Sequence, residues 1–196
     1  MIAVMKSLSE KGPKSFSRLM IAALPLCIGL CTPASVFGQS DGCVLVPDGR
    51  NPSEKILRCG GNLAIRSAPN TAYRLTNPDN RRQPGGARLD SGALLIEFTP
   101  NEGERDFRIL TPQAITAVRG TRWAVEVGRS QTSTLVISGA VEVTRRNSRR
   151  GAAPGVRESA VLRAGEGVDV AAGTGPIVVK RWAQTRIDAL MARFGQ

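Results

Sequence analysis

The sequence predicts an all-β fold, arranged as a sandwich or as a short β-solenoid of many short strands, followed by one C-terminal amphipathic helix. Short apolar segments recur between Gly, Pro and Asn residues, which is the pattern of strands joined by turns. Within residues 123–127 the large apolar side chains occupy every second position, as in a sheet with one buried face. Helical periodicity does not separate the segments, although a parallel α/β sheet would require intervening helices. Because aromatic residues make up only 4% of the chain, the core must rest on Val, Leu, Ile and Ala.

The strands expected in the first half of the chain begin at Cys43 and are divided by turn signals. Pro47-Asp48-Gly49 ends the first strand, and Gly60-Gly61-Asn62 separates the second from the third. Residues 77–86 show no periodicity and predict a loop. We expect strands at residues 43–46, 55–59, 63–65, 71–75, 87–89, 93–98 and 105–110.

Two glycines mark bends between the strands that follow Thr111. We expect these strands at residues 114–118, 123–127, 134–137 and 141–143. Arg119-Gly120-Thr121 lies between the first two, and a glycine flanked by strand residues marks a bulge, a sharp bend or a close backbone approach. Gly139 can adopt a positive φ where the chain reverses into the last of these strands. Arg119 is expected either to cap the bend by bonding to local carbonyl groups or to contact a partner directly.

A recurring tripeptide keeps the solenoid alternative open. Val141-Glu142-Val143 recurs as Val168-Asp169-Val170 at an interval of 27 residues, which is within the range of structural repeats. Repeated hairpins would give the same local pattern, so the sandwich and the solenoid remain equal alternatives. Residues 145–157, between the two tripeptides, are basic and rich in Gly, Ala and Pro, and predict a loop that extends into solvent.

The last segment, residues 179–194, changes to helical periodicity. Its apolar residues fall largely at spacings of three and four, and Gly195 follows where a helix commonly stops. The apolar stripe consists of Trp182, Ile187, Leu190, Met191 and Phe194. We expect the stripe to dock against the β-domain, and the alternative is presentation to a partner or to a membrane surface.

The N-terminal residues 1–38 predict a signal peptide and therefore export. Basic residues precede an apolar run at residues 19–31, which is about as long as a signal-peptide core and too short to span a bilayer comfortably. Small residues follow, so we expect cleavage after Gly38 and a location in the periplasm or outside the cell. Cleavage would remove four basic residues and one acidic residue and lower the formal charge from +11 to +8. An uncleaved anchor helix that extends to Phe37 is the alternative.

The cysteines predict one disulfide. Cys27 and Cys31 would leave with the signal peptide, while Cys43 and Cys59 remain. In an oxidising compartment these two are natural partners, and closing the loop between them would add about 3 kcal/mol by restricting the unfolded chain. A zinc site is the competing interpretation, but the chain has no histidine and two thiolates do not complete a tetrahedral shell. We therefore expect no metal.

The formal charge of +11 does not point to nucleic acid. The arginines are scattered without interleaved aromatic residues, which argues against a stacking platform for bases. Dense basic clusters occur at residues 81–82, 145–146 and 149–150, each among Asn, Ser, Pro or Gly. They are expected either to lie in solvated loops or to contact anionic lipid head groups or acidic polysaccharide.

The sequence carries no recognisable catalytic centre. The absence of histidine removes the commonest general base and the commonest metal ligand. Lys55 and Lys180 are the only lysines after Gly38, and neither is in a Ser-x-x-Lys arrangement. Glu166 and Asp169 lack the tandem repetition that would predict calcium, and most carboxylates are expected to keep a sheet face soluble. We expect neither enzymatic activity nor a cofactor.

Three ordered sequence blocks resemble the FecR-type domain, known from the extracytoplasmic part of iron-transport signalling regulators. They read T-P-x-A-I-x-A-V-R-G-T-x-W-x-V-x-V, T-x-x-x-V-x-x-G-x-V-x-V and L-x-A-G-E-G-V-D-V, at residues 111–127, 132–143 and 162–170. The resemblance covers roughly the central and later half of the chain. It implies an all-β extracytoplasmic domain that binds proteins and has no known catalytic centre.

With the resemblance, the chain divides into four parts: a signal peptide at 1–38, an N-terminal β region with the disulfide at 39–110, a FecR-like core at 111–178 and the helix at 179–196. Candidate contact or structural residues are Arg119, Gly120, Thr121, Trp123 and Gly139. Strand addition is expected around these residues and at 134–137.

The expected function is that of an exported, FecR-like binding module that acts by protein–protein recognition in the periplasm or cell envelope, in envelope or iron-related signalling. Only about eighteen residues precede the apolar run, too few for the sigma-factor-binding region of the signalling regulators, so we expect no classical anti-sigma activity. The alternative is a structural envelope protein or one that binds anionic polysaccharide. A third class is a peripheral membrane protein held by the C-terminal helix.

Overall fold

The structure is a computed structural model, and it describes residues 42–49, 55–77, 83–102, 106–146, 158–173 and 176–196. The predicted signal peptide at 1–38 and the basic pairs at 81–82 and 149–150 lie outside the described residues. A bilayer-spanning helix, which takes about 20 apolar residues, is not found among the residues that the structure describes.

The described residues form thirteen strands and one helix, and all the strands belong to one curled sheet. The elements are β1 Cys43–Pro47, β2 Lys55–Cys59, β3 Leu63–Ser67, β4 Ala72–Thr76, β5 Gly86–Phe98, β6 Phe107–Leu110, β7 Ala114–Val118, β8 Thr121–Val127, β9 Gln131–Ser138, β10 Ala140–Arg145, β11 Ser159–Arg163, β12 Glu166–Ala171, β13 Lys180–Arg181 and α1 Gln184–Ala192. The predicted all-β class with one C-terminal helix is confirmed.

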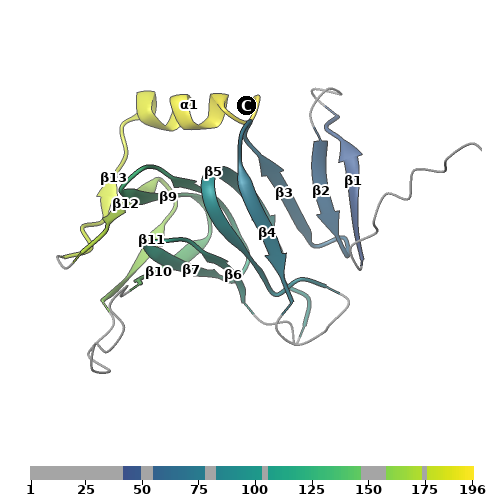
Figure 1. The fold of residues 1–196 in the computed structure, drawn as a ribbon, viewed down its shortest axis with the longest axis horizontal. Coiled ribbons are helices and arrows are strands. Elements are labelled where there is room, and N and C mark those ends of the chain that lie inside the picture. Colours follow the sequence, from purple (N-terminus) through teal and green to yellow (C-terminus); the bar gives the residue numbers. More distant parts are fainter. Residues whose placement is uncertain (1–41, 50–54, 78–82, 103–105, 147–157, 174–175) are drawn as a thin grey trace, which may run out of the picture. The chain divides into compact units, whose positions relative to one another are not determined.

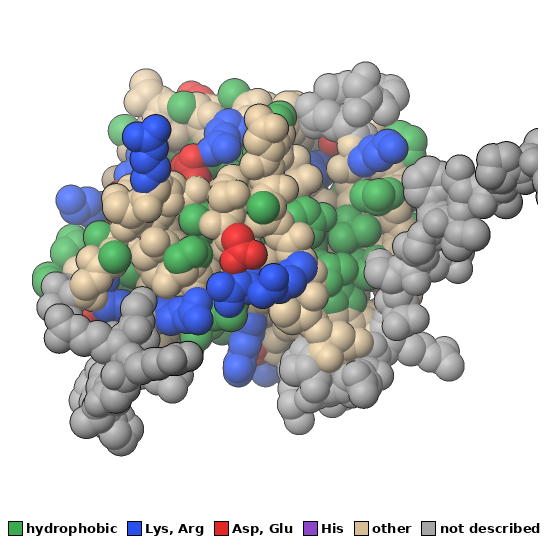
Figure 2. All heavy atoms as spheres, in the orientation of Figure 1, with side chains coloured by type: hydrophobic (Ala, Val, Ile, Leu, Met, Phe, Trp, Pro, Cys, Tyr) green, Lys and Arg blue, Asp and Glu red, His purple; other side chains and the backbone are tan. Residues whose placement is uncertain are grey.

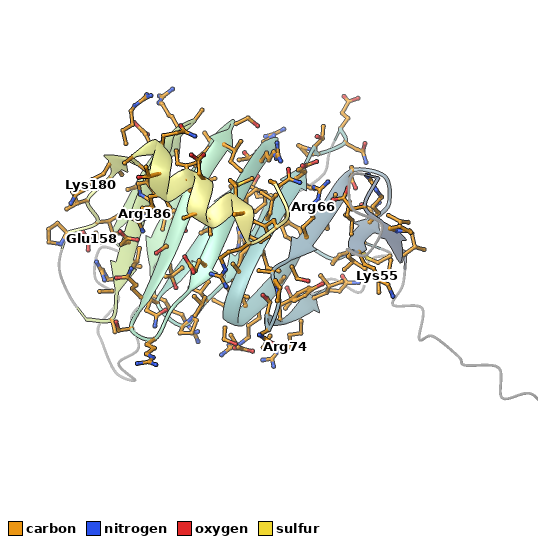
Figure 3. The ribbon with its side chains drawn as sticks, turned by 90° about the horizontal axis from the view of Figure 1, so that it is seen from above. Lys55, Arg66, Arg74, Glu158, Lys180 and Arg186 are labelled. Atoms are coloured by element: carbon orange, nitrogen blue, oxygen red, sulfur yellow. A yellow bond between two sulfur atoms is a disulfide. The ribbon has the colours of Figure 1, made fainter. Side chains whose placement is uncertain are left out.

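The sheet curls into two layers that face each other (Figure 1). One layer, which we call the helix-side layer, has the strand order β1-β2-β3-β5-β8-β9-β12-β13. The other, which we call the open layer, has the order β4-β5-β6-β7-β10-β11. Helix α1 lies across the outer face of the helix-side layer (Figure 3).

Strand β5 belongs to both layers because its two halves have different neighbours. Its first half pairs with β4 and β6, and its second half, from Gly92, pairs with β8 and β3. A bulge lies between the halves, where Ala72 pairs with Ser91 but Tyr73 pairs with Leu89. The extra residue moves the core-facing side chains of β5 from odd to even positions, because a one-residue shift reverses the faces of a strand.

Gly92 makes this bend possible. Its φ is 88°, and a Cβ at this position would lie 2.4 Å from Oγ1 of Thr71, so the site excludes any other residue without a shift. The sequence pattern predicts separate strands at 87–89 and 93–98. They are instead one continuous strand, because the bulge changes its direction without breaking the hydrogen-bonded ladder.

The main core lies between the two layers. Trp123 is fully buried, and its ring meets that of Phe107 edge-on at 6.3 Å between centroids, while Phe107 lies 5.7 Å from Phe98. Aliphatic side chains supply the rest, as the low aromatic content predicts, and each contributes about 1.5–3 kcal/mol on burial. They include Leu63, Ile65, Leu89, Leu94, Ile96, Ile109, Val125, Val136, Val141, Val143, Leu162, Val168 and Val170.

The strand pairing identifies the sandwich and not the solenoid. All pairs are antiparallel except β5 with β6. The recurring tripeptides at 141–143 and 168–170 lie in β10 and β12, which belong to different layers, so they are not stacked neighbours of a repeat. The recurrence reflects two core-facing strands with the same alternation.

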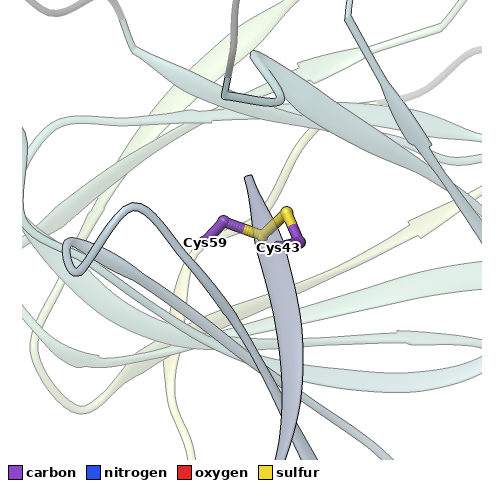
Figure 4. The surroundings of a disulfide bond; sticks show 2 residues. All are labelled: Cys43 and Cys59. Atoms are coloured by element: carbon purple, nitrogen blue, oxygen red, sulfur yellow. A yellow bond between two sulfur atoms is a disulfide. The ribbon is translucent and has the colours of Figure 1, made fainter. Parts of the chain in front are cut away.

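The predicted disulfide between Cys43 and Cys59 is confirmed (Figure 4). The two residues are direct partners in the β1–β2 ladder, with their Cα atoms 4.1 Å apart. The bridge therefore closes the open end of the β1–β2 hairpin and buries both sulfur-bearing side chains in the core.

Helix α1 is shorter than predicted, and Trp182 precedes it. The predicted helix begins at residue 179, but β13 occupies Lys180–Arg181 and the helix starts only at Gln184. Trp182 packs on the backbone of Gly167, where an added Cβ would lie 2.3 Å from the indole ring. The guanidinium of Arg186 lies 3.4 Å from the ring centroid, a cation–π contact that closes the other side.

The helix docks against the β-sheet, as expected. Leu190 and Phe194 are buried on the outer face of the helix-side layer, together with Trp182. The strands below contribute small and aliphatic side chains: Ala93, Leu95, Ala124 and Leu135. Two ion pairs reinforce the contact, Arg186 with Asp169 at 2.6 Å and Arg193 with Glu126.

Candidate interaction surface

The turns at Gly120 and Gly139 lock against each other. Both glycines have positive φ, 68° and 84°, and a Cβ on Gly139 would lie 2.5 Å from the carbonyl oxygen of Gly120. Thr121 is buried, and its hydroxyl donates to the carbonyl of Ala140 at 2.9 Å. The two connections, β7 to β8 and β9 to β10, are thereby held together.

This geometry divides the five candidate contact or structural residues at positions 119, 120, 121, 123 and 139 into those with a structural role and those exposed to solvent. Trp123 and Thr121 are buried and shape the core and the turn, so their side chains are not available to a partner. Gly139 is required by the close approach of the turns, and both Gly120 and Gly139 have a positive φ that favours glycine. Arg119 is exposed at the end of β7 and is the motif side chain that reaches solvent.

The expectation of strand addition at residues 134–137 is wrong. These residues lie in β9, which pairs with β8 on one side and β12 on the other, so both of its edges are occupied. Within the described residues the strands with one neighbour are β1, β4, β11 and β13. The sequence pattern could not show this, because it gives strands but not their lateral order.

The basic pair Arg145-Arg146 is not a solvated loop. Arg145 is the last residue of β10 and is 8% exposed, with an ion pair to Glu158 at 3.2 Å and a hydrogen bond to the carbonyl of Ala171 at 2.6 Å. Arg146 donates to the carbonyl of Thr111 at 3.1 Å. These two side chains hold neighbouring segments of the fold together. The alternative of a contact with lipid or acidic polysaccharide stays a prediction.

Three arginines gather instead on the outer face of the open layer, and we call them the arginine patch. Arg74 and Arg88 stand directly opposite each other on β4 and β5, and Arg108 lies on the adjacent strand β6. Asp90 is the acid beside them, 2.7 Å from Arg88 and 3.9 Å from Arg74. Figure 2 shows this row of basic side chains with one acidic side chain next to it.

Hydrophobic side chains lie next to the arginine patch on the same face. Leu110 and Ile115 are paired across β6 and β7 and are half-buried, and Val161 on the edge strand β11 is 60% exposed. No described helix covers these strands. We call the outer side of β4, β6, β7, β10, β11 and the first half of β5 the open face.

Asp48 and Glu97, near β1 and β3 of the helix-side layer, are held in ion pairs. Arg66 bonds to Asp48 at 3.0 Å and to Glu97 at 3.1 Å, and Arg122 also meets Glu97 at 3.1 Å. Arg66 lies on β3 in the view from above (Figure 3). A hollow of ≈ 320 Å³ is lined by Asp48 and Arg66, which already pair with each other, together with Lys55, Arg193 and Phe194.

Asp169 has a shifted pKa. Burial acts to raise the pKa of this carboxyl, but hydrogen bonds from Arg186 and Ser133, with the charges of Arg186 and Lys180, hold the pKa below its ordinary value. The expected lack of a calcium site at Glu166 and Asp169 remains a prediction. Among the described residues, Asp, Glu and Cys side chains do not gather in threes that could hold a metal ion.

The strand order defines the class of protein: an all-β sandwich with one layer covered by a C-terminal helix. Residues 52–142, a little under half of the chain, match the family model described as FecR protein, so this part of the chain is similar to a FecR-type domain. The match covers the strands from β2 into β10 and thus includes both the N-terminal β region and the first part of the predicted core. No curated protein matches the chain significantly.

Two crystal structures share this fold, and both are of a "putative anti-sigma factor" from Parabacteroides distasonis. One has a TM-score of 0.53 at 18% identity and covers 76% of this chain and 63% of that chain. The other has a TM-score of 0.50 at 19% identity and covers 76% of this chain and 59% of that chain. The chain thus spans about three fifths of the length of these proteins.

Proposed function

We propose that the protein is an exported binding module that recognises another protein in the periplasm or cell envelope through its open face, without a catalytic step of its own. The contrast between the two outer faces carries this proposal. The outer face of the helix-side layer is covered by α1, whereas the open face combines exposed cations with half-buried and exposed aliphatic side chains.

The charge arrangement of the arginine patch supports an acidic partner. Like charges directly opposite on neighbouring strands are unfavourable, and Arg74 and Arg88 have one carboxylate between them. Arg108 adds a third positive charge on the next strand. An acidic segment of a partner would relieve this repulsion, and arginine next to aliphatic surface is a common composition of protein interfaces.

The comparisons support a place in signalling. FecR-type domains occur in signalling regulators, and the two solved structures with this fold are described as an anti-sigma factor. We propose that this domain serves as the extracytoplasmic sensor or adaptor part of such a system.

Photo-crosslinking in intact cells tests the proposal. A photo-crosslinking side chain at Ala117, which lies between the arginine patch and Glu142 on the open face, should give a discrete adduct with another protein. The same side chain at Ala189, exposed on α1, is the matched control and should not. Arg74→Glu with Arg108→Glu should abolish the adduct, and an adduct that persists in this variant would contradict recognition through the arginine patch.

Binding to anionic polysaccharide is the second candidate, since the same arginines would attract any anionic polymer. Salt distinguishes the two. An interaction that depends on surface charge alone should be lost between about 50 and about 200 mM salt, whereas an interface that also buries Leu110, Ile115 and Val161 should largely survive. Binding of an acidic polysaccharide that is lost over this salt range, without any protein adduct in cells, would favour this candidate.

A further inference from the structure

Strand β1 presents an edge without charged residues. Within the described part of the chain β1 pairs only with β2. Its sequence is Cys-Val-Leu-Val-Pro, and Val44 and Leu45 are 56% and 61% exposed. Edge strands usually carry a charge, a bulge or proline that prevents further pairing, and an uncharged edge is a template for another strand. In β1 only Pro47, at the last position, acts in this way.

The register of β1 with β2 shows which backbone groups are turned outward. The N–H of Gly60 donates to the carbonyl of Gly42 at 3.2 Å, so this pair is a hydrogen-bonded one. Bonded and non-bonded pairs alternate along an antiparallel ladder. The N–H and C=O groups of Cys43 and Leu45, and the C=O of Pro47, therefore point away from β2.

A row of apolar side chains runs from the core to this edge. On the inner side of the helix-side layer Trp123, Ile96, Ile65, Leu57 and Leu45 are direct neighbours on successive strands. Their exposure rises from 0% at Trp123 to 61% at Leu45. Figure 2 shows hydrophobic side chains gathered at the surface over β1 and β2. The row ends in solvent although its other members form the core.

We propose that β1 pairs antiparallel with β1 of a second copy of this chain, centred on Leu45. Leu45 then faces Leu45 of the second copy, Val44 faces Val46, and Cys43 faces Pro47. The outward N–H groups of Cys43 and Leu45 each meet a carbonyl, and the two helix-side layers become one continuous sheet. The inner apolar rows join at the two Leu45 side chains. This pairing uses the β1 edge and is independent of the proposed function of the open face.

Symmetry and charge favour a second copy over a different strand. The five residues of β1 are centred on Leu45, and the outward groups of Leu45 are in the position that a symmetric hydrogen-bonded pair requires. Among the described residues, the cations on the neighbouring strand are Lys55 and Arg58 of β2, and in the pair they are separated from their counterparts by three strand spacings, about 14 Å. This exceeds the screening length of about 8 Å at physiological salt, so the net positive charge does not prevent the contact.

Sedimentation equilibrium on the protein as cells produce it tests the pairing. Over loading concentrations from about 1 to about 500 μM, the mass should rise from one chain to two and not further, because a two-fold pairing is closed. Leu45→Lys should weaken dimerisation at least about tenfold. Val44→Lys, on the opposite face of the same strand, should act in the same direction and serves as a second variant.

Val161→Lys is the matched control, because Val161 is equally exposed on another edge strand, β11. It should leave the dimer unchanged, and circular dichroism should show that all three variants are folded. The proposal is overturned if the wild-type protein stays monomeric at the highest concentration. It is also overturned if folded Leu45→Lys and Val44→Lys proteins dimerise as the wild type does, or if Val161→Lys weakens the dimer equally.

Discussion

The two outer faces of the sandwich differ in the type of side chain that their strands direct outward. On the helix-side layer the outward positions under α1 are small or aliphatic, whereas on the open face they include the arginine patch and Glu142. Strand β5 shows the change within one element: its first half directs Arg88 and Asp90 outward and its second half directs Ala93 and Leu95 outward. The outward residues of a strand thus report whether its face is covered.

The largest expected difference between the two faces is the loss of stability when a charged residue is introduced on each. Leu95→Arg puts an unpaired cation under α1, where it is fully buried, and we expect a loss of about 3–5 kcal/mol in the free energy of unfolding. Ile115→Arg on the open face is the control and should cost less than about 1 kcal/mol. Urea denaturation measures the free energy of unfolding of both variants. Equal losses would mean that α1 does not bury the outer face of the helix-side layer more than the open face is buried.

Removal of the indole ring tests how the helix is held. Trp182→Ala deletes the side chain that lies between Gly167 and Arg186, and we expect it to cost about 3 kcal/mol. Hydrogen exchange should quicken in α1 while β6 and β7 on the open layer remain protected. Equal quickening in both layers would show that α1 and the sheet unfold as one unit.

Acid should loosen the helix-side face before the open face. The pKa of Asp169 is lowered in the folded protein, so the stability that its ion pair with Arg186 provides is present above the ordinary pKa of about 3.9 and is lost as the pH falls through the lower folded value. The effect is modest because both side chains are partly exposed.

Trp182 reports this step, because its ring contacts Arg186. Tryptophan fluorescence should change below pH about 3.9 in the wild type. Asp169→Asn removes the titrating group and should show no change in that range. A transition of the same size in both proteins would assign the step to other carboxyl groups.

The smallest expected effect concerns the arginine patch. Arg74→Thr removes one of two like charges that stand opposite each other, and threonine suits an exposed strand, so we expect the protein to gain up to about 0.5 kcal/mol in stability. Arg58→Thr, an exposed strand arginine on the helix-side layer, is the control and should change stability less. A loss of stability at Arg74 would show that its contact with Asp90 outweighs the repulsion.

Local chemistry made most of the elements predictable. The alternation around Trp123 gives β8 and its buried face, and the glycines at 120 and 139 give the bends, because both depend on a few neighbouring residues. The disulfide follows from the two cysteines that remain after the expected signal peptide. The predicted start of α1 was wrong. Trp182 has the spacing of a helical apolar stripe, but it packs on the sheet from an extended segment before the helix.

The features that depend on the order of strands across the sheet could not be predicted from the sequence. Strand β11 was missed because Ser159–Arg163 follows a long polar segment and has, within the described residues, a single neighbour, the preceding strand β10. The arginine patch consists of residues 14 and 20 positions apart, and it exists because β5 pairs with β4 on one side and in parallel with β6 on the other. Arg145 looked solvated because its partner Glu158 is separated from it by 13 positions.

The dual pairing of β5 has a consequence for how quickly the chain reaches its native state. Neither layer is complete until β5 has met β3, β4, β6 and β8, which closes loops of very different length around a single strand. Topologies dominated by such distant contacts fold in milliseconds to seconds, slower than helical bundles of the same size. A freshly made chain therefore spends that time with half-formed ladders open to neighbouring molecules, and this interval is where a chaperone would matter most.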